Sequence, residues 1–183
     1  MAKMRECFKI GDIETPAPLW IIGPDVIEDE GFALEVAHVI SECAQRRNIP
    51  VVFKASYEKA NRSSTAAFRG PGLKAGLPIL ARIREETGLP ITTDVHDAEQ
   101  AKLAGAVVDV LQLPAFLCRQ NSLLEAAAAT GKVVNLKKGQ FLSPWDIASR
   151  VGVLESAGAV DIWITERGSS FGYQRLINDF RSV

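Results

Sequence analysis

The most densely polar stretch of the sequence, residues 54–72, directly follows a short apolar run and carries four cations. These are Lys54, Lys59, Arg62 and Arg69, and hydroxyl and amide side chains lie between them. Cationic groups supply charge to a bound phosphate or carboxylate, while hydroxyls and amides fix its direction. A solvated charged loop is the plainer interpretation of such residues. The position directly after an apolar run instead favours an anion site.

Two further basic groups follow apolar runs later in the chain. Lys137 and Lys138 end the first of them, and Arg167 follows the second. Because successive side chains of a strand point to opposite faces, only one of the two lysines can face a common site. A solvated lysine pair fits the spacing equally well. Arg167, followed by glycine, suits a phosphate, and the alternative is a turn arginine paired with Glu166.

Three polar side chains lie in or after apolar runs without adding cationic charge. Gln112 interrupts an apolar run, and a buried amide must be hydrogen-bonded, so it is either a substrate contact or part of a core network. Asp94 and His96 follow another run as a strand-end pair. Cys118 is interpreted as a packed thiol, because no basic partner at a helix terminus can be assigned to it. The sequence contains no Ser/His/Asp set, Walker loop or HExxH motif, which favours catalysis by positioning of anions.

Short apolar runs that alternate with amphipathic stretches must position these residues. Strands are predicted at 19–23 (buried), 51–54, 91–95, 107–113, 133–136 and 162–165, and helices at 32–47, 73–87, 98–103, 123–130, 144–156 (capped by Ser143) and 173–182. This alternation predicts an α/β fold with a parallel sheet. A doubly wound sheet and a TIM barrel both fit. Polar strand ends and the lack of a GxGxxG motif after the first strand favour the barrel.

Composition narrows the class of protein further. The 183 residues carry a net charge of −1, with 23% charged and 47% hydrophobic residues, which favours neither a nucleic-acid nor a membrane partner. The three cysteines lie far apart without metal-binding spacing, as in a reducing cytoplasm. We expect one domain over residues 1–183 with a small β-hairpin at about 8–14. A complete (β/α)8 barrel has about 250 residues, so about the first six βα units are expected here.

Six segments, taken in this order, resemble the 3-deoxy-manno-octulosonate 8-phosphate synthase family: FKASYEKANRSS, FRGPGL, TTDVH, LQLPAFLCRQ, NLKKGQFLSPWD and TERGSSFGY. The resemblance implies a (β/α)8 TIM barrel of the class I aldolase-like type. It implies a transferase that condenses phosphoenolpyruvate with D-arabinose 5-phosphate and water in Kdo and lipopolysaccharide biosynthesis. The alternatives are a related phosphoenolpyruvate-condensing synthase that uses another aldose, and a non-catalytic phosphosugar-binding fragment.

The resemblance also implies roles for the residues that match its motifs. Lys54, Lys59 and Asp94 would be catalytic, with Lys59 near the phosphoenolpyruvate carboxylate and Asp94 on the floor of the site. Phosphoenolpyruvate would further contact Ser56, Gln112, the backbone N–H of Ala115, Lys137 and Arg167. Arabinose 5-phosphate would bind Asn61, Arg62 and Ser63, and also Arg119 from a neighbouring subunit. That last contact implies a homo-oligomer, which in this family is a tetramer.

The sequence departs from the family pattern in two places. The family divides by a residue after the first strand, where Cys is a metal ligand and Asn marks the metal-independent class; this chain has Asp25. A carboxylate binds harder divalent metals, so Asp25 is interpreted as a metal ligand in preference to an Asn substitute. Secondly, the family's other metal ligands and last two βα units lie beyond Val183. We therefore expect a divalent metal only in a full-length protein, and no activity from this chain alone.

Overall fold

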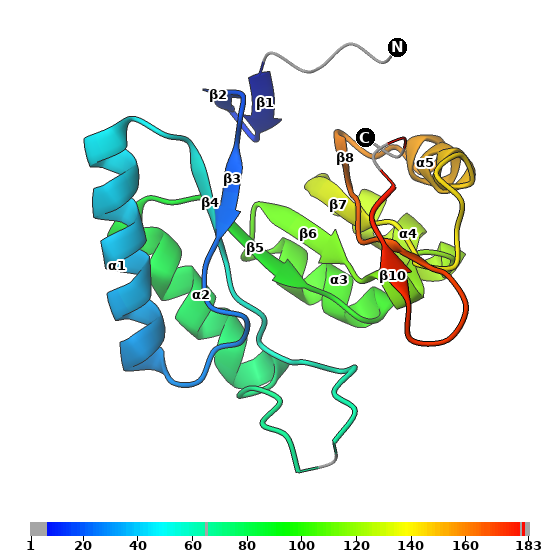
Figure 1. Cartoon of the computed structure of the whole chain (residues 1–183). Coiled ribbons are helices and arrows are strands. Elements are labelled where there is room, and N and C mark those ends of the chain that lie inside the picture. Colours follow the sequence, from blue (N-terminus) through cyan, green and yellow to red (C-terminus); the bar gives the residue numbers. More distant parts are fainter. Residues whose placement is uncertain (1–6, 65, 180, 182–183) are drawn as a thin grey trace. The chain divides into compact units, whose positions relative to one another are not determined.

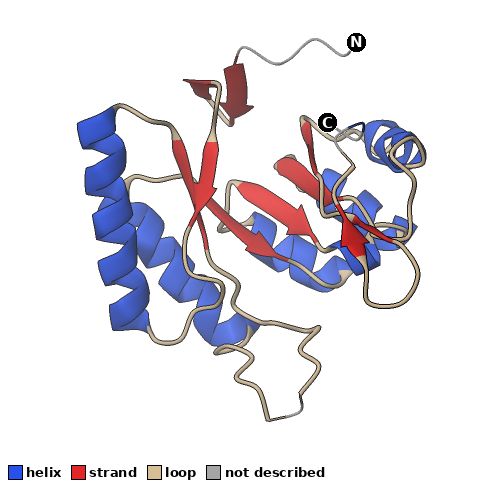
Figure 2. Cartoon of the chain, viewed as in Figure 1, coloured by secondary structure: helices blue, strands red, loops and turns tan. Residues whose placement is uncertain are grey.

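The computed structural model describes residues 7–64, 66–179 and 181. The described residues form two compact units, the first within residues 1–94 and 107–110 and the second within residues 95–106 and 111–183. Strands and helices alternate along both units (Figures 1 and 2). The parallel strands follow chain order, β3-β4-β5 in the first unit and β6-β7-β8 in the second. This is the βα alternation of a partial (β/α)8 barrel, which confirms the predicted fold class.

The first unit opens with an antiparallel hairpin of β1 (Cys7–Ile10) and β2 (Ile13–Pro16). Three parallel strands then form its sheet, namely β3 (Trp20–Ile22), β4 (Val51–Lys54) and β5 (Ile91–Asp94). Strands β4 and β5 are almost entirely buried, as expected for parallel strands that are covered on both faces. Their carboxyl ends carry the polar side chains of the candidate site.

Two helices pack against each other in the first unit, α1 (Glu30–Arg47) and α2 (Leu73–Thr87) (Figure 1). Helix α1 begins two residues earlier than predicted, because the Asp29 carboxylate accepts a hydrogen bond of 2.8 Å from the backbone N–H of Phe32. Helix α2 has the predicted bounds and ends at Gly88, which adopts the left-handed conformation.

The second unit continues the alternation, and the residues that follow its strands hold the later basic groups. Its elements are α3 (Ala98–Gly105), β6 (Val110–Leu113, whose first residue belongs to the first unit), the short 3₁₀ helix η1 (Ala115–Leu117), α4 (Asn121–Ala128), β7 (Val133–Lys137), α5 (Ile147–Ser156), β8 (Ile162–Thr165), β9 (Ser169–Ser170) and β10 (Leu176–Ile177). Strands β7 and β8 pair in parallel, and α3 packs against α4. Among the described residues, no helix combines the length and apolarity that crossing a bilayer requires.

Three further predictions about strands and helices differ from the structure. Strand β3 was expected to be buried, but Trp20 is 49% exposed, because β3 has a strand neighbour on one side only among the described residues. Strand β6 begins three residues after its predicted start. Helix α5 begins at Ile147, because Ser143 and Asp146 instead close a turn through two reciprocal hydrogen bonds of 3.3 Å.

The helix predicted at 173–182 is also wrong over the residues that the structure describes. Leu176 and Ile177 form β10, which pairs with β9. Gly172 and Gln174 adopt positive φ angles of 65° and 55°, which a right-handed helix does not allow. Positions 180, 182 and 183 lie outside the described residues.

Candidate anion-binding site

The segment after β3 lies along the end of β4 in the first unit. Val26 forms a parallel bridge with Ser56, and the Ile27 N–H donates a 3.0 Å hydrogen bond to the Ser56 carbonyl. Gly23 permits this approach, since a Cβ there would lie 2.0 Å from the Lys54 carbonyl oxygen. The close backbone contact brings Asp25 beside the polar residues that follow β4.

Three of the predicted residues form a hydrogen-bonded chain at the ends of β4 and β5. Lys54 Nζ donates to Ser56 Oγ at 2.6 Å, and Ser56 Oγ donates to Asp94 Oδ2 at 2.9 Å. Lys54 Nζ also lies 3.9 Å from Asp94 Oδ2. Ser56 is fully buried and Asp94 is 8% exposed. The chain therefore links an ammonium group to a carboxylate through a hydroxyl that is shielded from water.

Asp25 gathers two cations of the loop that follows β4. Lys59 Nζ lies 2.6 Å from Asp25 Oδ1, and Arg62 donates to Asp25 Oδ2 at 2.7 Å. Lys59 Nζ is also 3.8 Å from Asp94 Oδ2. The backbone of the loop is held as well, because the Lys59 N–H donates to the Arg69 carbonyl at 2.7 Å. One carboxylate thus contacts two cations of the same loop, and a backbone hydrogen bond ties Lys59 to Arg69.

The charges of this cluster leave one positive charge in excess. Lys54, Lys59 and Arg62 face Asp25 and Asp94. Burial raises the pKa of Asp25, but the hydrogen bond from Lys59 and the charges of all three cations outweigh burial, so its pKa is lowered. Asp25 is therefore ionised at neutral pH. A cluster of this kind attracts anions.

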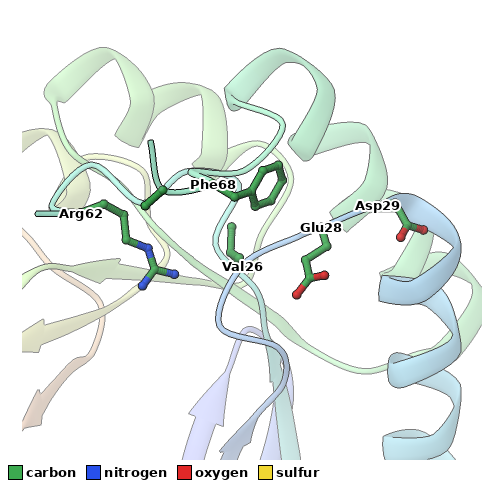
Figure 3. A pocket seen from close by; sticks show the side chains of 6 residues that line it. Val26, Glu28, Asp29, Arg62 and Phe68 are labelled. Carbon is green, nitrogen blue, oxygen red and sulfur yellow. The ribbon is translucent and has the colours of Figure 1, made fainter. Parts of the chain in front are cut away.

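The sugar-phosphate residues predicted beside Arg62 share its loop. Asn61 and Ser63 are exposed and flank Arg62 in the sequence. Arg62 also borders a cavity of about 610 Å³, whose lining is Val26, Glu28, Asp29, Arg62, Ala67 and Phe68. Figure 3 shows Arg62 at one end of this cavity, with Glu28 and Asp29 toward the other end. Arg62 therefore reaches both Asp25 and open space.

In the second unit, buried amides connect β6, β7 and β8. Asn135 Nδ2 donates to Gln112 Oε1 at 3.4 Å, and Thr165 Oγ1 donates to Asn135 Oδ1 at 2.7 Å. Gln112 is 4% exposed and Asn135 is 1% exposed. Gln112 thus takes part in a buried hydrogen-bond network, which fixes the direction of its amide.

The two lysines at the end of β7 have different surroundings. Lys138 is fully buried, and its Nζ donates to the carbonyl oxygens of Gly139 at 3.2 Å, Leu142 at 3.3 Å and Gly168 at 3.2 Å, and to Ser169 Oγ at 3.2 Å. Its Nζ also lies 3.7 Å from Glu166 Oε1. Lys137 is half-buried. The lysine directed into the protein is therefore Lys138, a structural role that sequence spacing alone does not reveal.

The remaining predicted residues of the second unit lie on loops after its strands. Arg167 is exposed and makes no ion pair with Glu166, whose Oε1 instead accepts a hydrogen bond from the Gly168 N–H. Arg119 is exposed just after η1, and the buried Ala115 begins η1. Cys118 is buried, and burial raises its thiol pKa despite the nearby Gly139 N–H. The packed-thiol interpretation of Cys118 agrees with this environment.

The predicted residues therefore fall into two sets. The first unit gathers Asp25, Lys54, Ser56, Lys59, Arg62 and Asp94 into one cluster, with Asn61 and Ser63 on the same loop. The second unit holds Gln112, Ala115, Arg119, Lys137 and Arg167. His96 is not part of either set, since its backbone N–H and its ring Nδ1 both lie 3.1 Å from Gln100 Oε1.

The surroundings of Asp25 do not fit a bound metal ion. Both of its carboxylate oxygens contact cations, and a divalent metal would have to replace them. Among residues 7–64, 66–179 and 181, no group of three or more His, Cys, Asp and Glu side chains is placed to hold a metal. The metal role predicted for Asp25 thus has no partner ligands in the described part of the chain.

A model of the DAHP synthetase I family matches residues 9–183. The chain belongs to this family. One curated relative, the 2-dehydro-3-deoxyphosphooctonate aldolase of Koribacter versatilis (strain Ellin345), is 53% identical over 182 residues, which cover 98% of this chain and 66% of the relative. The protein of that name from Bradyrhizobium sp. (strain ORS 278) is 57% identical over 167 residues, which cover 91% of this chain and 58% of the relative.

A third relative extends the similarity to the whole chain. The 2-dehydro-3-deoxyphosphooctonate aldolase of Synechococcus sp. (strain ATCC 27144 / PCC 6301 / SAUG 1402/1) is 51% identical over 183 residues, which are 100% of this chain and 63% of the relative. The chain thus spans less than two thirds of the length of these three relatives. The match to the DAHP synthetase I family includes both sets of candidate residues.

Proposed function

We propose that the protein condenses phosphoenolpyruvate with D-arabinose 5-phosphate and water, giving 3-deoxy-D-manno-octulosonate 8-phosphate and inorganic phosphate. The observation that carries this proposal is the gathering of Lys54, Lys59 and Arg62 around two carboxylates at the carboxyl ends of β4 and β5. Both substrates are anions, and such a cluster binds and orients anions. The names of the curated relatives, whose product is an eight-carbon phosphosugar acid, agree with this reaction.

In this proposal, each polar residue of the cluster in the first unit has its own role. Lys59 binds the phosphoenolpyruvate carboxylate, and Arg62, with Asn61 and Ser63, binds the phosphate of the aldose. As C3 of phosphoenolpyruvate attacks the aldehyde, the new alkoxide needs a proton, and the Lys54 ammonium supplies it. Water then adds at C2 and gives up a proton, which the Asp94 carboxylate accepts. Ser56, hydrogen-bonded to both groups, returns the proton to Lys54.

The second unit would supply the phosphate contacts of phosphoenolpyruvate. Lys137, Arg167 and the Ala115 N–H bind the phosphate. As its bond to C2 breaks, the C2 hydroxyl becomes the ketone and passes its proton to the departing phosphate, which leaves as hydrogen phosphate. Gln112, held by Asn135, contacts the same substrate. The exposed Arg119 reaches the sugar phosphate of a neighbouring subunit in a homotetramer. The protein acts as one domain in cytoplasmic Kdo synthesis, and its net charge of −1 favours small-molecule partners over nucleic acid.

A second candidate is a phosphoenolpyruvate-condensing synthase that uses another aldose, and the description of the matched family favours considering it. Competition between arabinose 5-phosphate and erythrose 4-phosphate separates the two candidates. We expect tighter binding and faster turnover with arabinose 5-phosphate. The reverse preference would favour the second candidate.

The proposal is tested on the complete gene product with purified phosphoenolpyruvate and aldose phosphate. Phosphate release should require both substrates, and Lys59→Met should weaken phosphoenolpyruvate binding in calorimetry by about tenfold or more, the value of a charge-assisted hydrogen bond. Lys102→Met, on an exposed face of α3, is the matched control and should bind like the wild type. Phosphate release without the aldose, or unchanged binding by Lys59→Met, would overturn the proposal.

A further inference from the structure

We propose that Asp25 is the resident counter-anion of the basic loop: its carboxylate holds Lys59 and Arg62 in the absence of substrate, and substrate anions displace it. This inference rests on the proposed function, which assigns these two cations to the two substrates. It gives Asp25 a positioning role in place of the predicted metal role. The contacts, the backbone and the charge of the cluster each support it.

The contacts show that Asp25 joins two cations that the substrates must use. Oδ1 lies 2.6 Å from Lys59 Nζ, and Oδ2 accepts a 2.7 Å hydrogen bond from Arg62. Each carboxylate oxygen therefore contacts a different cation. In the proposed reaction, each of these cations likewise binds a different substrate anion. A phosphate or carboxylate that binds either cation must therefore compete with the Asp25 carboxylate.

The backbone of Asp25 is fixed, whereas its carboxylate is accessible. Its carbonyl accepts a hydrogen bond of 3.3 Å from Lys54 Nζ, and the adjacent Val26 is bridged to Ser56. The Asp25 side chain is nevertheless 64% exposed, while that of Lys59 is 12% exposed. Rotation of one exposed side chain therefore uncovers both cations without moving the strand ends. A fixed backbone returns the carboxylate to them when the substrate leaves.

The net charge of the cluster favours the displacement of Asp25 by substrate anions. With Asp25 in place, Lys54, Lys59 and Arg62 outnumber Asp25 and Asp94 by one charge. Turning Asp25 outward leaves a larger positive excess for the substrate anions. Removal of its charge at this distance should tighten anion binding by about tenfold at low ionic strength, and salt should screen the effect.

The first experiment titrates phosphoenolpyruvate into the protein by calorimetry at low and high salt. Asp25→Asn should bind about tenfold tighter than the wild type at low salt, and the difference should shrink at high salt. Glu28→Gln is the matched control, because it removes the same charge three residues away and Glu28 makes no hydrogen bond or ion pair among the described residues. Equal or weaker binding by Asp25→Asn would overturn the inference.

A second measurement needs no ligand and separates this inference from the proposed function. Acetylation of lysines by an activated ester, read by mass spectrometry, should modify Lys59 several-fold faster in Asp25→Asn than in the wild type or Glu28→Gln. An unchanged Lys59 rate overturns the counter-anion role. Faster labelling without phosphoenolpyruvate binding by any of the three proteins supports the counter-anion role and contradicts the proposed function.

A third measurement tests the competing metal role directly. Titration with Mn²⁺ should show no binding that depends on Asp25, since both carboxylate oxygens contact cations. Stoichiometric Mn²⁺ binding that Asp25→Asn abolishes, and Glu28→Gln does not, would overturn the inference in favour of a metal ligand.

Discussion

Two lysines that follow strand ends, Lys59 in the first unit and Lys138 in the second, are held by different kinds of acceptor. Lys59 lies 2.6 Å from one carboxylate and 3.8 Å from another, and its side chain is 12% exposed. Lys138 is fully buried and donates to three backbone carbonyls and one hydroxyl. A side-chain carboxylate can rotate away when another anion arrives. Backbone carbonyls cannot leave without unfolding their loops, so only Lys59 is available to a ligand.

The largest expected effect is the loss of stability in Lys138→Met. This change leaves three carbonyls and Glu166 without their buried cation, and removing one partner of a buried charge costs about 3 kcal/mol or more. Urea unfolding measures it, with the exposed Lys102→Met as a control that should stay within about 0.5 kcal/mol of the wild type. Equal stability of Lys138→Met and wild type would contradict the buried structural role.

Gly76→Ala tests whether packing, in addition to ion pairs, fixes the loop that carries Lys59. A Cβ at Gly76 in α2 would lie 2.3 Å from the Cβ of the fully buried Tyr57. Overpacking of this kind costs about 1–3 kcal/mol, which thermal or urea unfolding would detect.

Gly152→Ala is the matched control for this substitution. Gly152 lies inside α5, and a Cβ there would meet nothing within 4 Å. The change should stabilise the protein by about 0.5–1 kcal/mol, because alanine favours a helix interior. If both alanine variants gained stability, the tight contact between α2 and Tyr57 would be disproved.

Lys59→Met should reduce anion affinity more than stability, whereas Lys138→Met should mainly reduce stability. Removal of Lys59 leaves Asp25 paired with Arg62, and leaves Asp94 hydrogen-bonded to Ser56. We therefore expect stability to fall by only about 1 kcal/mol, as for partly exposed ion pairs, although anion affinity falls markedly. Unfolding and calorimetry on the same preparation compare the two effects. A stability loss as large as that of Lys138→Met would remove the distinction between the lysines.

The smallest expected effect concerns thiol reactivity and leaves stability unchanged. Burial raises the pKa of the Cys118 thiol, so near pH 8 a smaller fraction of Cys118 is thiolate than for an ordinary cysteine. Cys43, by contrast, is exposed to a reagent in solution. A disulfide reagent followed by mass spectrometry should modify Cys43 first, and Cys118 only after denaturation. Rapid modification of Cys118 in the native protein would show that the loop next to Lys138 opens readily.

Patterns of neighbouring residues correctly predicted those helices and strands whose bounds depend on neighbouring residues alone. Helix α2 and its end at Gly88 follow from apolar spacing and a glycine stop, and β8 follows from a short β-branched run. The exposure of β3 depends instead on the number of strand neighbours, and β10 depends on pairing with β9. The spacing of residues in the sequence predicts neither the exposure of β3 nor the pairing of β10 with β9.

The candidate site shows the same limit. The types and order of its residues identified Lys54, Lys59, Arg62 and Asp94, and the structure brings these four together. The pairing of Asp25 with Arg62 spans 37 positions, and the bond from Lys138 to the Gly168 carbonyl spans 30. Contacts over such separations follow from the fold, so the pairing of Asp25 with Arg62 and the buried contacts of Lys138 could not be predicted from spacing.

The most direct test of these two lysine roles is acetylation of the wild-type protein with and without phosphoenolpyruvate, read by mass spectrometry. We expect Lys59 to react slowly and to be protected by phosphoenolpyruvate, while Lys138 stays unmodified in both samples until the protein is denatured. Modification of native Lys138 at the rate of Lys59, or a Lys59 rate that phosphoenolpyruvate does not change, would contradict the assigned roles.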